Sequence, residues 1–262
     1  GLGIPAEPLF RSRDEVPSSG PTVYWPDIST NAYGFKAMTG TVTNGAFAAL
    51  SADQSTEAKL INEDQLLGFG AVYADNNIAS LNYHKGTEWK SKNAEDGVAV
   101  DDQKKIRLYM QHQRAKITII LKAGVGVLRS TLENASNINM TIYSYKGATP
   151  TITEISPYAS TTTVNYLASD YGGAADNVLT TKYQAIVEPF NYTSNDKEIA
   201  QITVGGRTFT YKPSNDTSGT GDYNLAAGKH LMITITLSPG AAMSASVTDW
   251  TESSTDATLG PD

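Results

Sequence analysis

The clearest pattern in this chain is an alternation of apolar and polar residues on either side of two adjacent glycines, Gly205 and Gly206. Residues 199–204 and 207–211 alternate in this way, which is typical of strands that bury one face. Two glycines can adopt the positive φ values of a type I′ turn, so the runs predict a hairpin. The register places these residues opposite each other: Val204 and Arg207, Ile202 and Phe209, Ala200 and Tyr211. The apolar side chains then share one face.

A second strong segment, residues 105–121, changes its apolar parity halfway. Its first half has apolar residues at even positions and its second half has them at odd positions: Ile106, Leu108 and Met110, then Ala115, Ile117, Ile119 and Leu121. One regular strand cannot keep both sets on the same face. We therefore expect a β-bulge or a bend near residues 112–114, which would add one residue and restore the second half to the core.

Further strand patterns run along the whole chain, separated by turn residues. They are expected at residues 22–25, 32–38, 67–73, 138–145, 149–155, 183–187, 230–237 and 243–250. Only the stretch from Ser51 through residues 52–60 could start a short helix. The pattern predicts an all-β chain of two sandwiches, with residues 22–134 in the first and 135–262 in the second. Five side chains of the second should be buried: Ile202, Phe209, Ile233, Ile235 and Val247.

Composition narrows the class of protein. The chain has 262 residues, of which 18% are charged, and its formal net charge is −7. Basic residues are scattered, so the sequence shows no nucleic-acid footprint. With no cysteine, disulfides, thiolate catalysis and cysteine zinc sites are excluded. No apolar run approaches the ~20 residues of a membrane span, which favours a soluble chain or the mature part of an exported one.

Candidate chemistry is sparse. The three histidines, His84, His112 and His230, fall on separate elements without metal-ligand spacing. Acidic pairs at residues 63–64, 95–96 and 101–102 are interpreted as solvated loop charge. The glycine pairs at 172–173 and 205–206 precede no helix, so they are not phosphate loops. We therefore assign no metal, no cofactor and no catalytic residue, and the sequence favours a protein that is not an enzyme.

Aromatic residues leave an alternative function open. Seven of them lie in or beside loop-rich segments: Tyr24, Trp25, Tyr33, Trp89, Tyr158, Tyr166 and Tyr171. Aromatic faces stack on sugar rings. One hypothesis for the function is therefore a surface protein that binds carbohydrate through a β-sandwich and does not polymerise. The same residues also suit the core and rim of any sandwich.

Residues 1–21 are rich in proline, glycine and charge, and we expect them to form an exposed, flexible leader. A trypsin-like protease would easily reach Arg11 and Arg13 within it. The alternative is a disordered leader whose arginines are incidental. The segment before them contains two prolines and is a poor strand.

Five segments together resemble one family of bacterial surface proteins. They are YWP at residues 24–26, HQRAKI at 112–117, YQAIVEP at 183–189, LAAGKH at 225–230 and VTDW at 247–250. Their order and content are similar to those of the fimbrillins of Bacteroidales, which are fimbrial subunits of the cell surface. The resemblance spans most of the chain, and its last two segments are the most diagnostic.

The resemblance implies two tandem transthyretin-like β-sandwich domains in a subunit of an outer-membrane-associated fimbria, with a role in adhesion and virulence. It also implies export as a lipoprotein and removal of a leading strand by an arginine-directed protease, for which Arg11 and Arg13 are the candidate sites of proteolytic maturation. Polymerisation would follow by strand exchange with other fimbrial subunits, and the partners could include a host protein or glycan. A strand from a neighbour would fill the groove that the removed strand leaves.

The segment after Trp250 bears on the position in the fibre. Residues 251–262 contain one large apolar residue, Leu259, and a penultimate proline, Pro261. Such a segment lacks the alternating side chains that a partner's groove would bind. We therefore expect a tip or accessory subunit, since the shaft subunits of this family donate a C-terminal strand.

Overall fold

The computed structural model describes residues 33–72, 81–85, 88–91, 110–124, 126–166, 176–216, 221–237 and 244–249. These residues lie mainly in β-strands, and their helices are short, which confirms the all-β prediction. They divide into two compact units. The first unit contains the described parts of residues 33–48 and 65–112, and the second contains those of 49–64 and 113–249.

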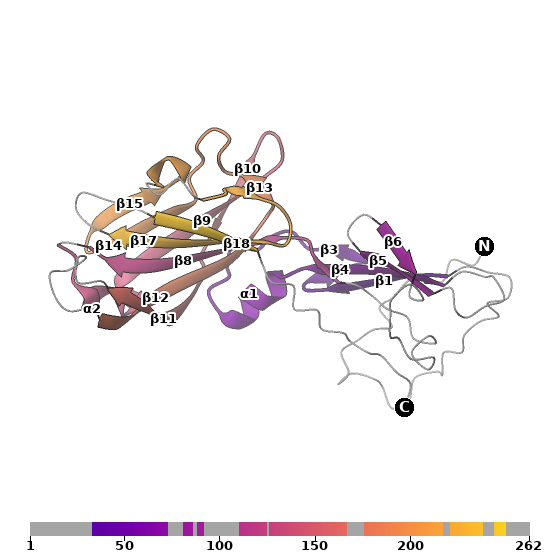
Figure 1. Cartoon of the computed structure of the whole chain (residues 1–262), viewed down its shortest axis with the longest axis horizontal. Helices are drawn as coiled ribbons and strands as arrows, with labels where there is room; N and C mark the ends of the chain where they lie inside the picture. The colour runs from indigo at the N-terminus through magenta and orange to yellow at the C-terminus, as the bar shows by residue number, and fades with distance from the viewer. Residues whose placement is uncertain are drawn as a thin grey trace, which may run out of the picture. The chain divides into compact units, whose positions relative to one another are not determined.

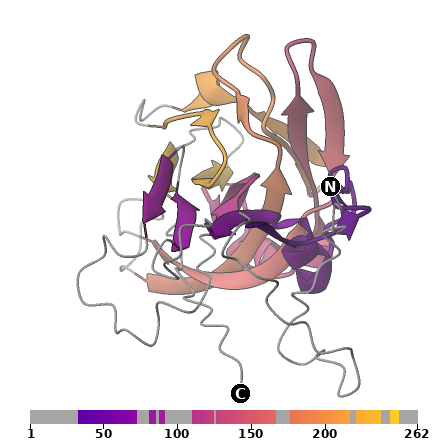
Figure 2. The ribbon, with the colours of Figure 1, turned by 90° about the vertical axis from the view of Figure 1, so that its right-hand side faces the viewer.

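The first unit contains one five-stranded sheet and a small hairpin. The sheet is formed by β1 (Tyr33–Thr39), β4 (Leu66–Val72), β5 (Leu81–Lys85) and β6 (Glu88–Ser91) in that order, with β7 (Gln111–His112) also paired to β4. The hairpin is formed by β2 (Val42–Thr43) and β3 (Ala46–Phe47). Its turn, Asn44-Gly45, has φ values of 51° and 72°, as a type I′ turn requires. These strands, coloured indigo to purple, can be followed in Figure 2.

The second unit contains two larger sheets. The four-stranded sheet has the order β10 (Thr151–Ile155), β9 (Ile138–Lys146), β14 (Ala200–Val204), β15 (Arg207–Tyr211). The five-stranded sheet has the order β11 (Tyr158–Tyr166), β12 (Asp176–Val187), β8 (Ala115–Ala123), β17 (Lys229–Leu237), β18 (Ser244–Asp249). All described neighbours in these two sheets are antiparallel except β8 and β17, which are parallel. A two-stranded pair, β13 (Phe190–Asn191) with β16 (Asn224–Leu225), adjoins them.

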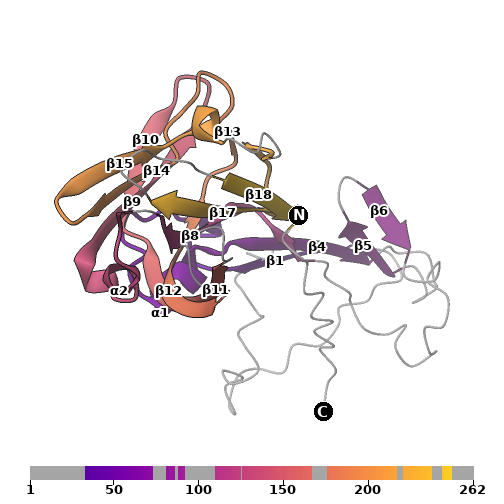
Figure 3. The same ribbon diagram turned by 60° about the vertical axis from the view of Figure 1, so that its left-hand side comes forward.

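The two sheets form the layers of a sandwich around one core, as Figures 1 and 3 show. Strands with period-two patterns send alternate side chains into this core. From the five-stranded sheet these include Ile117, Ile119, Leu121, Leu231, Ile233 and Ile235, and from the four-stranded sheet Met140, Ile142, Ala200 and Ile202. Because both sheets contribute buried alternate residues, neither layer can fold stably without the other.

The hairpin at Gly205-Gly206 has the predicted register. Val204 pairs with Arg207, Ile202 with Phe209 and Ala200 with Tyr211. The φ values of Gly205 and Gly206 are 56° and 73°, which confirms the type I′ turn. Ile202, Ile233 and Ile235 are fully buried, as predicted. Phe209 is only half-buried because β15 stands at the edge of its sheet, and the side chain of Val247 lies outside the described residues.

Of the two expectations for residues 112–114, the β-bulge is wrong, whereas the bend is confirmed at residues 113–114. β7 ends at His112 and pairs with β4 in the first unit, whereas β8 begins at Ala115 and pairs with β12 and β17 in the second. The apolar parity changes because the chain passes from one sheet to another. No single face therefore has to accommodate both halves of the segment.

The observed units also differ from the predicted division at residue 134. β8 precedes that residue, yet it is the central strand of the five-stranded sheet in the second unit, and residues 49–64 belong to that unit as well. Pairing between distant segments decides the division, and periodicity carries no information about such pairing. The expected leader at 1–21 and the expected strand at 22–25 lie outside the described residues.

The short helix expected after Ser51 begins later than predicted. Helix α1 (Glu57–Glu63) starts after Thr56, whose hydroxyl accepts a hydrogen bond from the Lys59 N–H at 3.3 Å. This side chain satisfies one of the free N–H groups of the first turn. The other described helical pieces are α2 (Arg129–Leu132) and the 3-10 turns η4 (Ala135–Asn137) and η5 (Pro213–Asn215). None of the helices in the described ranges is long and apolar enough for a membrane crossing.

The turn at Gly205 provides a test of the hairpin. An added Cβ there meets no atom within 4 Å, so only backbone strain decides the effect of a substitution. Gly205→Val should lower the free energy of unfolding by about 1–2 kcal/mol, because a β-branched residue is strained at positive φ. Gly205→Asn should lower the free energy of unfolding by only a small fraction of that amount, because asparagine tolerates positive φ. Urea unfolding of both variants checks the difference, and equal losses would contradict the turn assignment.

Candidate functional site

Residues 49–64, called here the docked segment, lie against the sandwich of the second unit. The Gln54 N–H donates to the Ser156 carbonyl at 3.0 Å, and the Ser156 N–H donates to the Ala52 carbonyl at 2.8 Å. Asp53 and Ser156 thereby form a parallel β-bridge. Residues 65–112 of the first unit separate the docked segment from β8 in the sequence. The docked segment nevertheless belongs to the same compact unit as β8.

The side chain of Gln54 replaces a missing strand neighbour. Its amide donates to the Ile186 carbonyl at 2.9 Å and accepts from the Ile186 N–H at 2.8 Å. β11 pairs with β12 only as far as Gln184, so it does not reach Ile186. A fully buried peptide group without partners would be costly, and the Gln54 amide, itself 0% exposed, satisfies both of its polar atoms.

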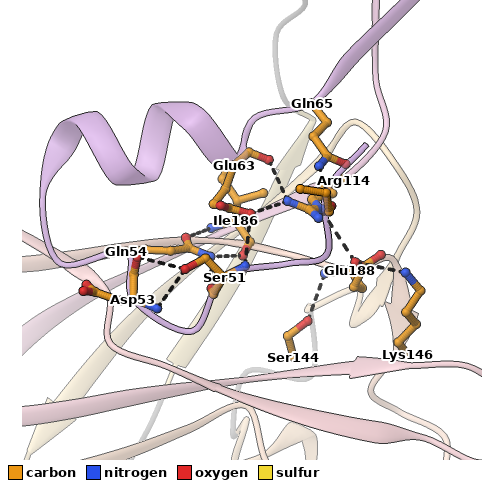
Figure 4. Close-up of polar contacts among 11 residues, drawn as sticks. Ser51, Asp53, Gln54, Glu63, Gln65, Arg114, Ser144, Lys146, Ile186 and Glu188 are labelled. Carbon is orange, nitrogen blue, oxygen red and sulfur yellow. Dashed lines mark hydrogen bonds and ion pairs between the residues drawn. The ribbon is translucent and has the colours of Figure 1, made fainter. Parts of the chain in front are cut away.

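An ion network surrounds Arg114, the residue just before β8 (Figure 4). Arg114 is 2% exposed, and its guanidinium forms an ion pair with the Glu63 carboxylate and donates to the Glu63 carbonyl at 3.2 Å. Its Nε lies 3.7 Å from Oε1 of Glu188, which is also 3.3 Å from Nζ of Lys146. Two positive and two negative side chains therefore balance within one cluster.

Backbone hydrogen bonds help to hold both acidic residues of the network in place. The Ser51 N–H donates to Glu63 Oε2 at 3.2 Å, and the Glu188 N–H donates to the Ser144 hydroxyl at 2.9 Å. The network thus connects the end of α1, the start of β8, the end of β12 and the strand β9. Buried charges are tolerated only when they are paired and hydrogen-bonded, and this cluster meets both conditions. The paired charges therefore hold these four elements of the second unit together.

Sequence reasoning missed this network. Glu63 was interpreted as solvated loop charge, but it is 6% exposed and holds Arg114. Arg114 and Glu188 belong to the segments HQRAKI and YQAIVEP, which resemble the family but do not indicate that the two residues are buried. Arg114 comes directly before a strongly apolar strand, which is a weak signal of burial, but nothing in the sequence pairs it with Glu63, which precedes it by 51 positions.

The residues that the sequence singled out as candidate sites lie outside the described residues or on separate strands. Arg11 and Arg13 lie outside the described residues, as do the acidic pairs at 95–96 and 101–102. His84 lies in β5, and His112 lies in β7 in the first unit, whereas His230 lies in β17 in the second. Across the described ranges, no group of three or more histidine, aspartate or glutamate side chains is placed to hold a metal ion.

The aromatic residues considered for sugar binding do not form a described platform either. Tyr24, Trp25 and Tyr171 lie outside the described residues, and the side chains of Tyr33 and Trp89 are not described. Tyr166 is buried, and its hydroxyl accepts a hydrogen bond from the Ala123 N–H at 2.6 Å. Tyr158 is half-buried on β11. Tyr166 therefore belongs to the core of the sandwich.

His230 is held neutral in the fold. Burial lowers its pKa from 6.5 to about 4, and the positive charge of Lys116, its neighbour on β8, acts in the same direction. Its Nε2 lies 2.8 Å from the Thr118 hydroxyl. That hydrogen bond suits a neutral imidazole, whose Nε2 can accept from the hydroxyl.

The ion network predicts a large loss of stability when it is broken. Glu63→Gln should lower the free energy of unfolding by about 3 kcal/mol, because Arg114 then stays buried without its main partner. Replacing both, as Glu63→Met with Arg114→Met, should cost less than the sum of the two single changes. Urea unfolding of Glu63→Gln, of the two single methionine variants and of their combination measures these losses. The exposed pair Lys59–Asp53, at 2.5 Å, is the matched control, and Lys59→Met should shift the midpoint little. Equal shifts at both pairs would contradict a structural role of Arg114.

His230 predicts a dependence of stability on pH. The unfolded chain takes up a proton near pH 6.5, whereas the folded chain does so only near pH 4. The free energy of unfolding should therefore fall as the pH is lowered from 6.5 to 4, and the His230 share should be on the order of 1–2 kcal/mol after allowance for solvent screening. His230→Gln should make this decline shallower, with His112→Gln as the control. A decline that is unchanged in His230→Gln would contradict the assignment.

Comparisons with known proteins give a family match and similar solved structures. A family model described as fimbrillin-like matches residues 9–250. A solved structure from Bacteroides uniformis, provisionally assigned to cell adhesion, is 17% identical with a TM-score of 0.42, over 82% of this chain and 66% of that one. Another from Bacteroides ovatus, with the same provisional assignment, is 14% identical with a TM-score of 0.41, over 84% of this chain and 68% of that one. No curated protein matches the chain.

The chain therefore spans about two thirds of the length of these two solved proteins. The match to the family model is more extensive, because it includes the described strands of both compact units, from β1 in the first to β18 in the second. With nearly the whole sequence inside that match, the chain belongs to the fimbrillin-like family.

Proposed function

We propose that this protein is a cell-surface fimbrial subunit that serves adhesion. The observation that carries the proposal is the fimbrillin-like match over residues 9–250. Members of such a family are structural rather than catalytic, and the described residues are consistent with this role. Their buried polar residues are used to hold a β-sandwich together, and the ion network around Arg114 has no reactive group to offer a substrate.

We further propose that the chain is exported as a lipoprotein precursor and becomes part of an outer-membrane-associated fimbria. Its fold would comprise two tandem transthyretin-like sandwiches. Support comes from the second unit, whose two sheets enclose one core, and from the sheet of the first unit. Without cysteine, such a subunit must obtain its stability from packing and from buried polar contacts.

Assembly would proceed by donor-strand exchange after proteolysis at Arg11 or Arg13. Removal of a leading strand leaves a groove of unpaired backbone groups and apolar pockets, and a strand from a neighbouring subunit fills it. Main-chain hydrogen bonds and side-chain burial are gained together, so the joint can persist without a covalent link. The partners are other fimbrial subunits, and adhesion adds a host protein or glycan as a further partner.

Within the fibre we propose a tip or accessory position. Residues 251–262 offer one large apolar residue, Leu259, and are therefore a poor donor strand. A subunit that accepts a strand but donates none from this segment would stand at the end of a row.

The maturation step is tested with an arginine-specific protease. Cleavage should occur first after Arg11 or Arg13 and leave the remainder folded, because an exposed polar segment is cut more readily than a packed strand. Mass spectrometry of the products identifies the bond. The matched control is the double variant Arg11→Lys/Arg13→Lys, which keeps both charges and removes the cleavage sites. Earlier cleavage at Arg129 or Arg207 in the sandwich would contradict the proposal.

The assembly step uses the same proteins. Trimmed and untrimmed chains are mixed and run on a gel without boiling, beside the uncleavable variant and a variant lacking residues 251–262. Ladders that need trimming and survive deletion of residues 251–262 would support strand exchange with another donor. Ladders that disappear with that deletion would contradict the tip assignment, and an absence of ladders even with added fimbrial subunits would contradict the polymerisation.

A further inference from the structure

The strand β11 stands at one end of the five-stranded sheet, beyond β12 (Figure 3). It pairs with β12 over its whole length, from Tyr158 opposite Gln184 to Tyr166 opposite Asp176. In an antiparallel pair, every second residue directs its N–H and C=O away from its neighbour. Among the described residues, no backbone group pairs with that outer edge of β11. Within the described ranges, the strand order of this sheet therefore ends at β11.

β11 differs in the charge of its side chains from the other strands at the ends of the larger sheets. Among the three described sheets of four or five strands, each of the other strands at an end of the strand order carries at least one charge: Lys36 on β1, Glu88 and Lys90 on β6, Glu154 on β10, Arg207 on β15 and Asp249 on β18. Charges on an edge discourage pairing with other chains. β11, with the sequence YASTTTVNY, has no charge, no proline and no glycine, and it is the longest of the six. It therefore lacks the usual protection of an exposed edge.

The sequence of β11 is complementary to itself in the antiparallel direction. If two copies pair about Thr162, the opposed residues are Tyr158 with Tyr166, Ala159 with Asn165, Ser160 with Val164, Thr161 with Thr163, and Thr162 with itself. Each pair unites residues that suit strands, and aromatic, threonine and β-branched neighbours stabilise such pairings. A two-fold axis at Thr162 makes the interface identical for both copies.

The neighbouring strand raises no electrostatic objection to this register. Lys182 of β12 pairs with Ser160 of β11. In the dimer Ser160 lies opposite Val164 of the second copy, which pairs with Val178 of that copy. Asp176 pairs with Tyr166, so its row continues to Tyr158 and Gln184 of the second copy. Like charges therefore never face each other across the axis, although the whole chain has a net charge of −7.

An exposed leucine of β12 adds an apolar contribution. Leu179 of β12 lies opposite Thr163, and its side chain is 57% exposed. In the paired arrangement Leu179 lies one strand away from the joint. It is in one cross-strand row with Thr163 of its own copy and Thr161 of the second copy. Methyl groups of those threonines and the leucine side chain form a continuous apolar row across the joint.

We propose that two copies of this chain associate through β11, antiparallel and about a two-fold axis at Thr162, so that their five-stranded sheets form one continuous sheet. This pairing goes beyond the proposed function and is independent of it, because it needs neither proteolysis nor a donated terminal segment. It joins subunits side by side, whereas strand exchange joins them in a row.

Sedimentation equilibrium of the full chain over a range of concentrations tests the association. The mass should rise from 28.0 kDa toward twice that value. Thr161→Lys/Thr163→Lys should weaken the dimer at least about tenfold, because lysines then oppose each other twice across the axis. Thr161→Lys/Thr163→Asp should restore it, because each lysine then faces an aspartate of the other copy. Thr208→Lys, on the exposed edge strand β15, is the control.

The register is tested separately by crosslinking, since the natural chain has no cysteine. Thr162→Cys should form a disulfide between copies under mild oxidation, because residue 162 faces itself. Asn165→Cys should not, because two copies of residue 165 lie about 20 Å apart in this register. Circular dichroism and urea midpoints confirm that each variant is folded. A chain that stays monomeric, a dimer insensitive to both lysines, or equal crosslinking of the two cysteine variants would overturn the proposal.

Discussion

The buried guanidinium of Arg114 is the constraint on which the second unit depends. A permanently charged side chain that is 2% exposed requires carboxylates at contact distance, and the fold supplies Glu63 from the docked segment and Glu188 from the end of β12. These partners come from regions 51 positions before and 74 positions after it in the chain. Satisfying one charge therefore fixes the relative placement of three distant segments.

The docked segment shows how polar contacts extend a β-sandwich beyond its strands. Gln54 supplies the hydrogen bonds that a strand neighbour would give Ile186, and Glu63 supplies the charge that Arg114 needs. Both side chains are buried, so the segment becomes part of the core rather than a surface loop. In a chain without disulfides, such contacts provide the specificity that covalent links give to disulfide-bonded proteins.

Sheet edges connect this architecture to the biology of a fimbrial subunit. A subunit of a surface fibre must remain folded on its own and still present backbone groups to other chains. Charged edges such as β10 and β15 discourage unwanted pairing, whereas the uncharged β11 does not. The distribution of charge over the edges thus separates surfaces that stay solvated from a surface that is suited to association.

The sequence by itself determined the local structure of this protein. Alternation around Gly205-Gly206 fixed the hairpin register, because side chains of a strand alternate between faces and two glycines suit positive φ. Five short segments, spaced along the chain, were enough to predict the fimbrillin family. Only the tertiary structure decided which strands share a sheet. It assigned the two halves of residues 105–121 to different sheets, placed β8 beside β17 in parallel, and buried Glu63 against Arg114. Periodicity reports which face of an element is buried, but the partner of that face is set by contacts between residues far apart in the chain.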